Sequence, residues 1–460
     1  MKYDFDEIID RKNTNSQNVE GWRSYIFKCG PDEVFPYKDD EFIRMWVADM
    51  EFAVAPEIRQ AIIDRVDRKI LGYTILSDGK YQAAFKKWCQ DKYDWSFEDG
   101  ELTFSPGVIP ALYQLVEDLV KPQNGKVLTL TPAYGFFLHA CEYNGVELVT
   151  SPLKISDDAG GRDDAGGRDG AGRRDGADRR DGADRRDSTD RRDSTDVRND
   201  AGGKCGTDRR FEIDFDDFEA KAADPQVKML MFCNPHNPTG RVWSEDELRR
   251  VAGIVEKYGL WVVSDEIHCD LIRTGLRHIP LGKVMPGYDR LITAMSASKT
   301  FNLAGLSFSD IIIRSHEERK RFIRRDKTHG AINPLSVAAH KAAYEQAGEW
   351  LDELKLYLDG NLKFVKDFIS ENIPTAVFQV PDATYFAWVD FRKTLPDVKD
   401  LSLFFANNAG VLLEGGDALF VGNAEGFVRL NLAMPRALVK EGLERMAAAI
   451  ERYSPGTDKK

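Results

Sequence analysis

The chemistry that this sequence can support centres on Lys299, which follows two hydroxyl residues, Ser296 and Ser298. A lysine attacks as a nucleophile only when its amine is neutral, and a buried position near other cations lowers its pKa. Two polar motifs precede the lysine: Asp265 ends an apolar run, and Asn237 lies in the segment Asn-Pro-His-Asn-Pro-Thr-Gly. If the fold brings these motifs together, they supply an amine, a carboxylate and an amide to one site.

A glycine-containing turn supplies a predicted anion site. Residues 104–112 read as a strand, a turn at Gly107 and the start of a helix. The first N–H groups of a helix have no partner within the helix, and the helix dipole favours an anion beside them. The start of this helix is therefore expected to bind an anion such as a phosphate group.

Arg429 is the candidate group for binding a carboxylate. A guanidinium can bind a carboxylate with two parallel hydrogen bonds. The apolar residues on both sides of Arg429 indicate a buried strand, where an unpaired arginine would be costly. A simple ion pair at the surface is the alternative.

These groups need a sheet that brings strand ends together. Strand patterns occur at residues 127–131, 227–233, 259–264, 291–295 and 309–314 and alternate with helical patterns. This alternation of strands and helices implies a mostly parallel α/β sheet with helices on both faces. Ligands of such sheets lie beyond the carboxyl ends of the strands, where the candidate residues occur.

Beyond residue 315 the pattern changes. A long helical segment is expected from Pro334 to Glu371, followed by two segments, residues 377–380 and 385–390, that alternate like antiparallel strands. We expect a smaller α+β domain that is joined by the N-terminal arm.

The three polar motifs, in this order and at these spacings, resemble the active site of fold-type I pyridoxal phosphate enzymes of the aminotransferase class I/II superfamily. The resemblance implies a mostly parallel seven-stranded sheet with helices on both faces, plus a smaller α+β domain. The segments Trp-Val-Ala-Asp-Met, residues 46–50, and Asp-Glu-Ile-His-Cys-Asp, residues 265–270, are similar to the cystathionine β-lyase-like branch. The cofactor implied is pyridoxal 5′-phosphate.

The resemblance assigns a role to each candidate residue. Lys299 would form the Schiff base and act in catalysis, Asp265 would keep the pyridine nitrogen protonated, and Asn237 would hold the phenolic oxygen. Tyr134 would stack on the ring, and His268 occupies the position where transaminases usually have tyrosine. The phosphate and substrate contacts implied are Gly107, Val108, Ile109, Ser296 and Ser298 for the phosphate, Arg429 and Asp49 for the substrate, and Tyr73 reaching in from the partner subunit of a homodimer.

One position departs from the transaminase pattern. Classical members have an arginine eight residues after the lysine, where this chain has Ser307. The β-lyase-like branch shares this departure. The phosphate charge must be balanced in another way, to which Tyr73 of the partner would contribute.

The expected domain organisation has four parts: an arm at residues 1–48, a large domain at 49–155 and 211–314, an insertion at 156–210 and a small domain at 315–460. Residues 157–198 are a six-residue repeat rich in Asp, Arg and Gly with almost no large apolar side chain. Such a segment cannot bury enough surface to offset its ordering entropy, so we expect it to be disordered and dispensable. A tether for a ligand or nucleic acid is the less favoured alternative.

Composition narrows the possible partners and location. The chain has 460 residues and a formal net charge of −12, which argues against a general nucleic-acid binder. No run of about 20 apolar residues occurs, and the start is polar and acidic, so we expect no membrane span or leader. The six cysteines are scattered, which suits free thiols in the cytoplasm and no metal site.

The favoured function is a carbon–sulfur β-lyase that cleaves L-cystathionine or related cysteine S-conjugates to pyruvate, ammonia and a thiol. The alternative is an aminotransferase that uses a 2-oxo acid, because the fold and cofactor would be the same. A regulatory module that senses pyridoxal phosphate is a third reading, but it would need a helix-turn-helix domain, for which the N-terminal arm is too short.

Overall fold

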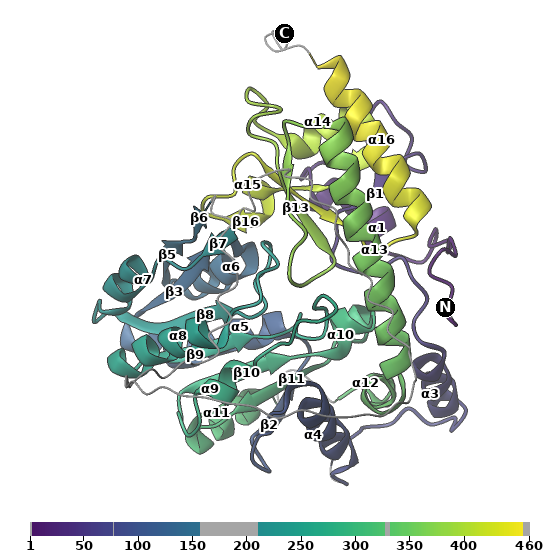
Figure 1. The fold of residues 1–460 in the computed structure, drawn as a ribbon. Coiled ribbons are helices and arrows are strands. Elements are labelled where there is room, and N and C mark those ends of the chain that lie inside the picture. Colours follow the sequence, from purple (N-terminus) through teal and green to yellow (C-terminus); the bar gives the residue numbers. More distant parts are fainter. Residues whose placement is uncertain (1, 77, 157–209, 327–331, 454–460) are drawn as a thin grey trace, which may run out of the picture. The chain divides into compact units, whose positions relative to one another are not determined.

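A seven-stranded sheet lies at the centre of the larger of two compact units in this computed structural model (Figure 1). The structure describes residues 2–76, 78–156, 210–326 and 332–453. The larger unit comprises Met1–Lys154 and Phe211–Lys460, and the smaller comprises Ile155–Arg210. The predicted disorder of the six-residue repeat concerns residues outside the described ranges. The predicted division into an arm, a large domain and a small domain stays a prediction.

The order of the strands in the sheet is β2-β11-β10-β9-β8-β3-β5. Their bounds are β2 Leu102–Ser105, β3 Lys126–Thr131, β5 Glu147–Pro152, β8 Val227–Cys233, β9 Trp261–Asp265, β10 Leu291–Met295 and β11 Ser309–Ile313. The run from β10 through β9, β8 and β3 to β5 is parallel, whereas β11 is antiparallel to both β10 and β2. The expected mostly parallel α/β sheet is therefore confirmed.

Alternating side chains of the strands cover the two faces of this sheet. On β8, Met229 and Met231 pack on one face, and Leu230 and Phe232 pack on the other. Successive residues of a strand point to opposite faces, so a strand that is buried on both sides is apolar throughout. The first face is covered by α5 Val108–Leu119, α6 Gly135–Asn144 and α11 His316–Asp326; the second by α7 Phe215–Ala222, α8 Glu245–Tyr258 and α9 Leu281–Val284.

The start and the end of helix α8 are both determined by its local sequence. The Ser244 hydroxyl accepts a hydrogen bond from the N–H of Glu247 at 3.2 Å, and the Glu247 carboxylate accepts one from the N–H of Ser244 at 2.8 Å. This capping box satisfies two N–H groups that the helix itself leaves free. Gly259, with φ of 63°, ends the helix in the left-handed region and turns the chain into β9.

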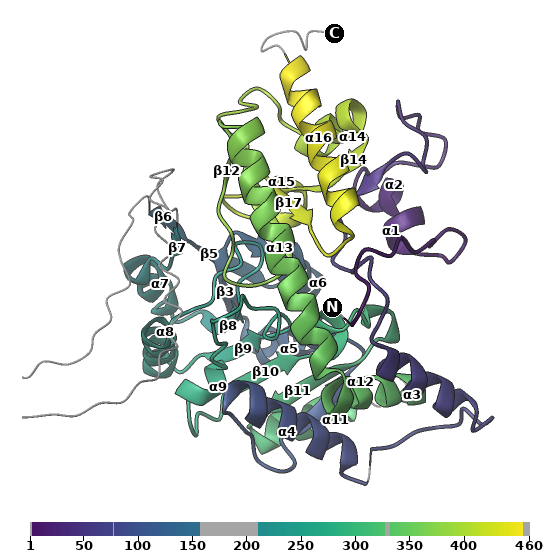
Figure 2. The ribbon, with the colours of Figure 1, turned by 45° about the vertical axis from the view of Figure 1, so that its right-hand side comes forward.

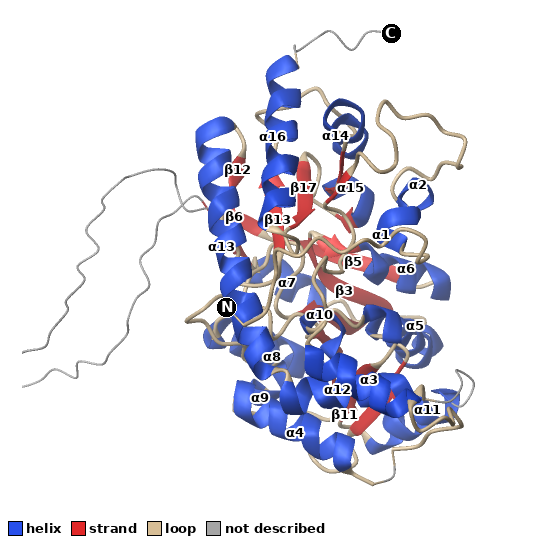
Figure 3. Cartoon of the chain, turned by 90° about the vertical axis from the view of Figure 1, so that its right-hand side faces the viewer, coloured by secondary structure: helices blue, strands red, loops and turns tan. Residues whose placement is uncertain are grey.

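A smaller antiparallel sheet has the order β12-β13-β17-β15, with bounds Val377–Phe378, Phe386–Asp390, Phe427–Asn431 and Glu414–Gly415. The helices α14 Leu401–Ala409 and α16 Arg436–Arg452 pack on it in a separate apolar core (Figure 3). Two further two-stranded pairs belong to the larger unit: β1 Ile43–Arg44 with β14 Val411–Leu412, and β4 Ala133–Tyr134 with β16 Phe420–Val421. The strands β6 Lys154–Ser156 and β7 Arg210–Glu212 form another pair.

The long helix α13, Gly348–Asn372, connects two apolar cores (Figure 2). Its first half, including Trp350 and Leu354, packs with α3 Pro56–Val66, α4 Lys80–Tyr93 and α12 Pro334–Gln346. Its second half, including Leu362 and Val365, packs with the small sheet. The long helical segment predicted from Pro334 to Glu371 is helical in the structure and is divided in two, because α12 ends at Gln346 and α13 begins at Gly348. Glycine is a poor residue for continuing a helix, which fits a break at this point.

The remaining short elements are α1 Gln17–Glu20, α2 Trp22–Tyr25, α10 Ala297–Thr300, α15 Gly416–Leu419 and the 3₁₀ turns Lys121–Gln123 and Ala304–Leu306. Within the residues that the structure describes, no helix is both long and apolar enough to cross a membrane.

Candidate active site

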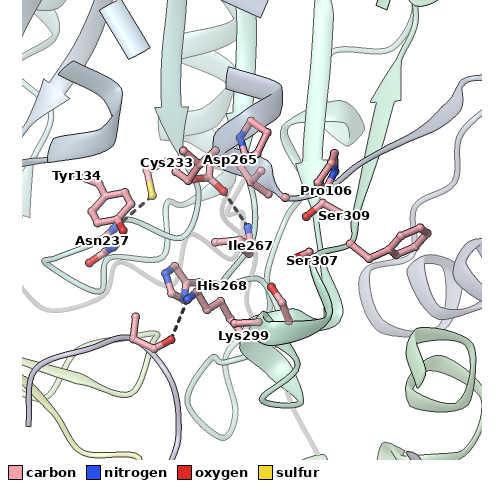
Figure 4. Close-up of a pocket in the computed structure, with 18 of the residues that line it drawn as sticks. Pro106, Tyr134, Cys233, Asn237, Asp265, Ile267, His268, Lys299, Ser307 and Ser309 are labelled. Atoms are coloured by element: carbon pink, nitrogen blue, oxygen red, sulfur yellow. Dashed lines mark hydrogen bonds between the residues drawn. The ribbon is translucent and has the colours of Figure 1, made fainter. Parts of the chain in front are cut away.

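A cavity of about 220 Å³ lies beyond the carboxyl ends of β8 and β9, beside the N-terminal end of α5 (Figure 4). Loops that follow several strands supply its walls, as expected for a sheet of this type. Of the residues predicted from the sequence, the following line it: Gly107, Val108, Ile109, Tyr134, Asn237, Asp265, His268, Ser298, Lys299 and Arg429. The structure thus brings together groups that are more than 300 positions apart in the chain.

Lys299 lies on the short helix α10, which follows β10. Its Nζ atom donates a hydrogen bond to the main-chain oxygen of Ala48 at 2.8 Å. Burial lowers the pKa of Lys299 to about 8, with a further lowering from Arg429, against the attraction of Asp49 and Asp265. About half of the amine is therefore neutral at mildly alkaline pH, and the neutral form is the one that a nucleophile requires.

Asp265 and Asn237 line the cavity from two neighbouring strands, β9 and β8, and the loops that follow them. Asp265 is the last residue of β9, and its Oδ1 accepts a hydrogen bond from the N–H of Ile267 at 3.2 Å. Burial raises the pKa of this carboxyl to about 6. Asn237 lies in the loop after β8, where its N–H points to the Cys233 sulfur at 3.4 Å (Figure 4). A cationic ring nitrogen beside Asp265 would restore the charge that burial disfavours.

His268 is a buried neutral imidazole. Burial, together with the charges of Lys299 and Arg429, lowers its pKa to about 3. Its ring meets those of Tyr385 and Phe386 edge to face, at centroid distances of 6.5 and 5.9 Å. Among the described residues no hydrogen-bond partner reaches its Nδ1 atom. His268 lines the cavity, and this unpaired nitrogen could bond a ligand there.

The start of α5 fits an anion. Gly107 is the residue before the helix, and no side chain of the described part of the chain caps the first N–H groups. A Cβ atom at Gly107 would approach the Pro110 ring at 3.3 Å, so a larger residue would crowd this turn. The hydroxyl residues Ser298, Ser307 and Ser309 line the same cavity. The donor set suits a phosphate group, and pyridoxal phosphate carries one.

Three predicted residues lie outside the lining of the cavity. Ser296 uses its hydroxyl to cap α10, accepting from the N–H of Ser298 at 3.0 Å and donating to the oxygen of Phe308 at 2.8 Å. Asp49 pairs with Arg11 at 2.7 Å. Tyr73 is 99% exposed. The roles predicted for these residues stay predictions.

Arg429 also lines the cavity, with its guanidinium 4.1 Å from the centre of the Phe386 ring. Its Nη1 donates to Asn237 Oδ1 at 3.4 Å, and its Nη2 donates to the oxygen of Trp46 at 3.3 Å and to Glu414. Sequence reasoning missed Glu414. The need for a counter-ion to a buried arginine was a usable signal, but only the pairing of β15 with β17 identifies which acid supplies it.

Sequence reasoning also missed Arg11. This residue of the N-terminal arm pairs with Asp49 at 2.7 Å and with Glu51 at 2.6 Å. It thereby fixes the segment that carries Ala48, the hydrogen-bond partner of Lys299. No motif marks Arg11, because its role depends on a contact across about 40 residues of chain.

Comparison with known proteins agrees with this geometry. Residues 201–446 match the family described as aminotransferase class I and II. The chain is 33% identical to cystathionine β-lyase PatB of Bacillus subtilis, over 88% of this chain and 92% of that protein. It is 27% identical to protein MalY of Escherichia coli, over 97% and 99%.

Solved structures give a similar result. A pyridoxal phosphate-bound C–S lyase from Staphylococcus hominis is 39% identical, covers 97% of this chain and 98% of its own, and superposes with a TM-score of 0.81. Cystalysin from Treponema denticola, which contains pyridoxal 5′-phosphate, is 30% identical over 98% of this chain and 99% of its own, with a TM-score of 0.79.

Proposed function

This chain belongs to the aminotransferase class I and II family and is a pyridoxal phosphate-dependent carbon–sulfur lyase, and we propose that its substrates are L-cystathionine and related cysteine S-conjugates. The products would be pyruvate, ammonia and a thiol, which is homocysteine when cystathionine is the substrate. The observation that carries this proposal is the arrangement of Lys299, Asp265 and Arg429 around one cavity.

Bound pyridoxal phosphate supplies a carbonyl group for the substrate amine and a ring that can accept electrons from Cα. Arg429 binds the substrate α-carboxylate and so orients Cα. Lys299, as a neutral amine, removes the Cα proton, and burial keeps its pKa close to the range in which it can do so. Asp265 holds a proton at the ring nitrogen, and Asn237 donates to the phenolic oxygen.

The remaining contacts of the cofactor follow from the cavity wall. The N–H groups of Val108 and Ile109 and the hydroxyl of Ser298 would hold the phosphate, with the turn at Gly107 leaving room for it. Tyr134 would lie against one face of the ring. His268, which stays neutral, would bond the ring or substrate through its orphaned nitrogen. Ser296 would act indirectly, by capping the helix that carries Lys299.

A homodimer with shared active sites is part of the proposal. The apolar side chains of Ile70, Leu71, Tyr73 and Ile75 are 55–99% exposed. A cluster of this kind in one segment supports an interface with another chain. Tyr73 would cross to the partner and contact its cofactor phosphate, and Asp49 would lie at the mouth of the substrate pocket.

The proposed location is the cytoplasm, and the proposed domains are those expected from the sequence. The cysteines Cys29, Cys89, Cys141, Cys233 and Cys269 are free thiols. Free buried thiols persist in a reducing compartment, which supports this location.

The test is to incubate the purified enzyme with pyridoxal phosphate and L-cystathionine in the absence of any 2-oxo acid. Pyruvate and a free thiol should appear in equal amounts, and Lys299→Ala should release neither. If turnover instead requires added 2-oxoglutarate and yields glutamate, the enzyme is an aminotransferase and the proposed substrates are wrong.

A further inference from the structure

Glu414 lies directly opposite Arg429 in the register of β15 and β17. Both side chains are almost fully buried, with 4% of Glu414 and 1% of Arg429 exposed. The Nη2 atom of Arg429 donates to Oε2 of Glu414, which is the one carboxylate that contacts this guanidinium within the described ranges. The group proposed to bind the substrate carboxylate is therefore already paired with a carboxylate of the protein.

The hydrogen bonds of Arg429 leave no free edge for a second carboxylate. A guanidinium has two edges that can form two parallel hydrogen bonds, Nη1 with Nη2 and Nε with Nη2. Both edges use Nη2, and Nη2 already donates to Glu414 and to the oxygen of Trp46. Nε has no partner among the described residues. A substrate carboxylate can take up either edge only if Nη2 gives up one of its present acceptors.

Charge decides which acceptor leaves. Trp46 offers a neutral main-chain oxygen, whereas Glu414 carries a negative charge that would lie beside the incoming carboxylate. Two carboxylates that share one buried site cannot both stay ionised without a large cost, and one of them takes up a proton. Glu414 is the candidate, because the substrate carboxylate gains the cation that Glu414 loses.

The surroundings of Glu414 agree with a proton taken up on binding. Arg429 on β17 and Lys299 on α10 attract its negative charge, and Tyr25 on α2 and Tyr134 on β4 face the same site as neutral phenols. Burial outweighs both cations and raises the pKa of Glu414 to about 7. Loss of the Arg429 contact removes the larger of the two attractions, so the pKa rises further in the complex.

We propose that Glu414 is a positioning residue that holds the Arg429 guanidinium in the resting site and releases it to the substrate carboxylate by taking up one proton. The ion pair between Arg429 Nη2 and Glu414 breaks, an ion pair between Arg429 and the substrate carboxylate forms, and the proton comes from solvent to a Glu414 carboxylate oxygen. This inference rests on the proposed role of Arg429 in binding the substrate.

The experiment measures how many protons the enzyme takes up when a carboxylate ligand binds. The holoenzyme is titrated by calorimetry with 3-(methylthio)propionate, a carboxylate with a thioether and no amine, in buffers that differ in their heat of protonation. At a pH about one unit above the pKa of Glu414, wild type should take up about one proton per site. Glu414→Gln should bind this ligand while taking up close to none, because its amide cannot titrate. The visible absorption of the bound cofactor, recorded alongside, shows whether the cofactor takes up the proton instead.

The two proposals fail in different ways. If wild type binds the ligand without uptake, if Glu414→Gln takes up as many protons as wild type, or if the cofactor absorption accounts for the proton, Glu414 does not act as inferred. If wild type does not bind the ligand, or if Arg429→Lys binds it as tightly, the role of Arg429 in the proposed function is wrong. The wild-type titration decides the inference even if Glu414→Gln fails to fold. Glu219→Gln, which alters an exposed acid paired with Lys257, should behave as wild type.

A second readout separates positioning from simple packing. With wild type, KM for an amino-acid substrate should rise with pH above the pKa of Glu414, because a proton must be taken up for binding. With Glu414→Gln this dependence should be lost while kcat changes less than KM. A loss of kcat with the pH dependence of KM unchanged would overturn the inference.

Discussion

Lys299 and Ala48 are joined by a hydrogen bond of 2.8 Å across 251 positions of sequence. Asn302, three residues after the lysine, reinforces this connection. Its side chain accepts from the N–H of Met50 at 3.0 Å and donates to the oxygens of Met50 at 3.0 Å and Phe52 at 3.2 Å. The lysine loop, which we define as residues 299–302, is therefore hydrogen-bonded to the segment at residues 48–52. Both segments together determine the position of the Lys299 amine.

We predict that Asn302 sets the position of the lysine loop through these bonds. Asn302 has φ of 58°, a left-handed conformation that Asn and Gly adopt readily. Asn302→Gly keeps the conformation and loses the bonds, and should lower the free energy of unfolding by about 2 kcal/mol. Asn302→Ala should lose about 1 kcal/mol more because of backbone strain. Denaturant unfolding measures both, and a fall in kcat of Asn302→Gly should accompany its loss of stability.

The comparison of the two variants separates the causes. Equal stability of Asn302→Gly and wild type would show that the side-chain bonds contribute nothing. Equal stability of Asn302→Ala and Asn302→Gly would show that the left-handed backbone carries no penalty here.

The pKa of Lys299 predicts how the cofactor is taken up. Burial lowers this pKa to about 8, and only the neutral amine can attack the cofactor. Below this value the rate at which the apoenzyme forms its covalent link should rise about tenfold per pH unit, and it should level off above it. Stopped-flow absorbance after mixing apoenzyme with pyridoxal phosphate measures the rate. Lys283→Ala, at a partly exposed position, should give the same profile, and a rate that is flat over the two units below pH 8 would contradict the prediction.

The strands were predictable from the sequence because their apolar runs are short and separated by turn residues. Residues 227–233 match β8 in full, and residues 291–295 match β10. Their order in the sheet was not predictable. β8 pairs with β3 across about 100 residues of chain, and only the packing of helices on both faces selects that neighbour.

Some residues of the candidate site were also predictable from the sequence, and others were not. Lys299, Asp265 and Asn237 stand in local motifs at strand ends, so the sequence places them on one edge of the sheet. Glu414 and Arg11 carry no motif, because each acquires its role from partners on another element: Arg429 for Glu414, and Asp49 and Glu51 for Arg11. Contacts of this kind are properties of the folded chain and leave no local pattern.

Asp310 predicts a pH-dependent loss of stability away from the cavity. This buried carboxylate on β11 accepts hydrogen bonds from Tyr81 at 2.9 Å and Tyr344 at 2.8 Å, and burial raises its pKa to about 7. The folded state holds this proton more tightly than the unfolded state does. The protonated Asp310 therefore makes its full contribution to the free energy of unfolding below its ordinary pKa of 3.8. That contribution is lost as the pH rises to about 7. The change amounts to at most about 4 kcal/mol.

Asp310→Asn should remove this dependence, since an amide of the same shape does not titrate. The stability of Asp310→Asn relative to wild type should rise as the pH increases from about 4 to about 8, as measured by urea unfolding at each pH. Asp99→Asn at the surface should show no such trend. A stability difference between Asp310→Asn and wild type that stays constant with pH would show that Asp310 keeps the same charge throughout.

The exposed Tyr73 predicts complementation between inactive chains. If Tyr73 acts in the partner's site, Lys299→Ala in one chain and Tyr73→Phe in the other affect the same site of a mixed dimer. One site then combines the intact Lys299 of one chain with the intact Tyr73 of the other, and the second site carries both defects. In a random mixture half of the dimers are mixed, so activity should recover to at most about one quarter of the wild-type value. Pyruvate release measures the recovery, and mixed dimers isolated with two different affinity tags should reach at most about one half of the wild-type value, because one of their two sites is intact. If verified mixed dimers stay as inactive as their parents, each chain builds its site without Tyr73 of the partner, and the 99% exposure of this side chain needs another explanation.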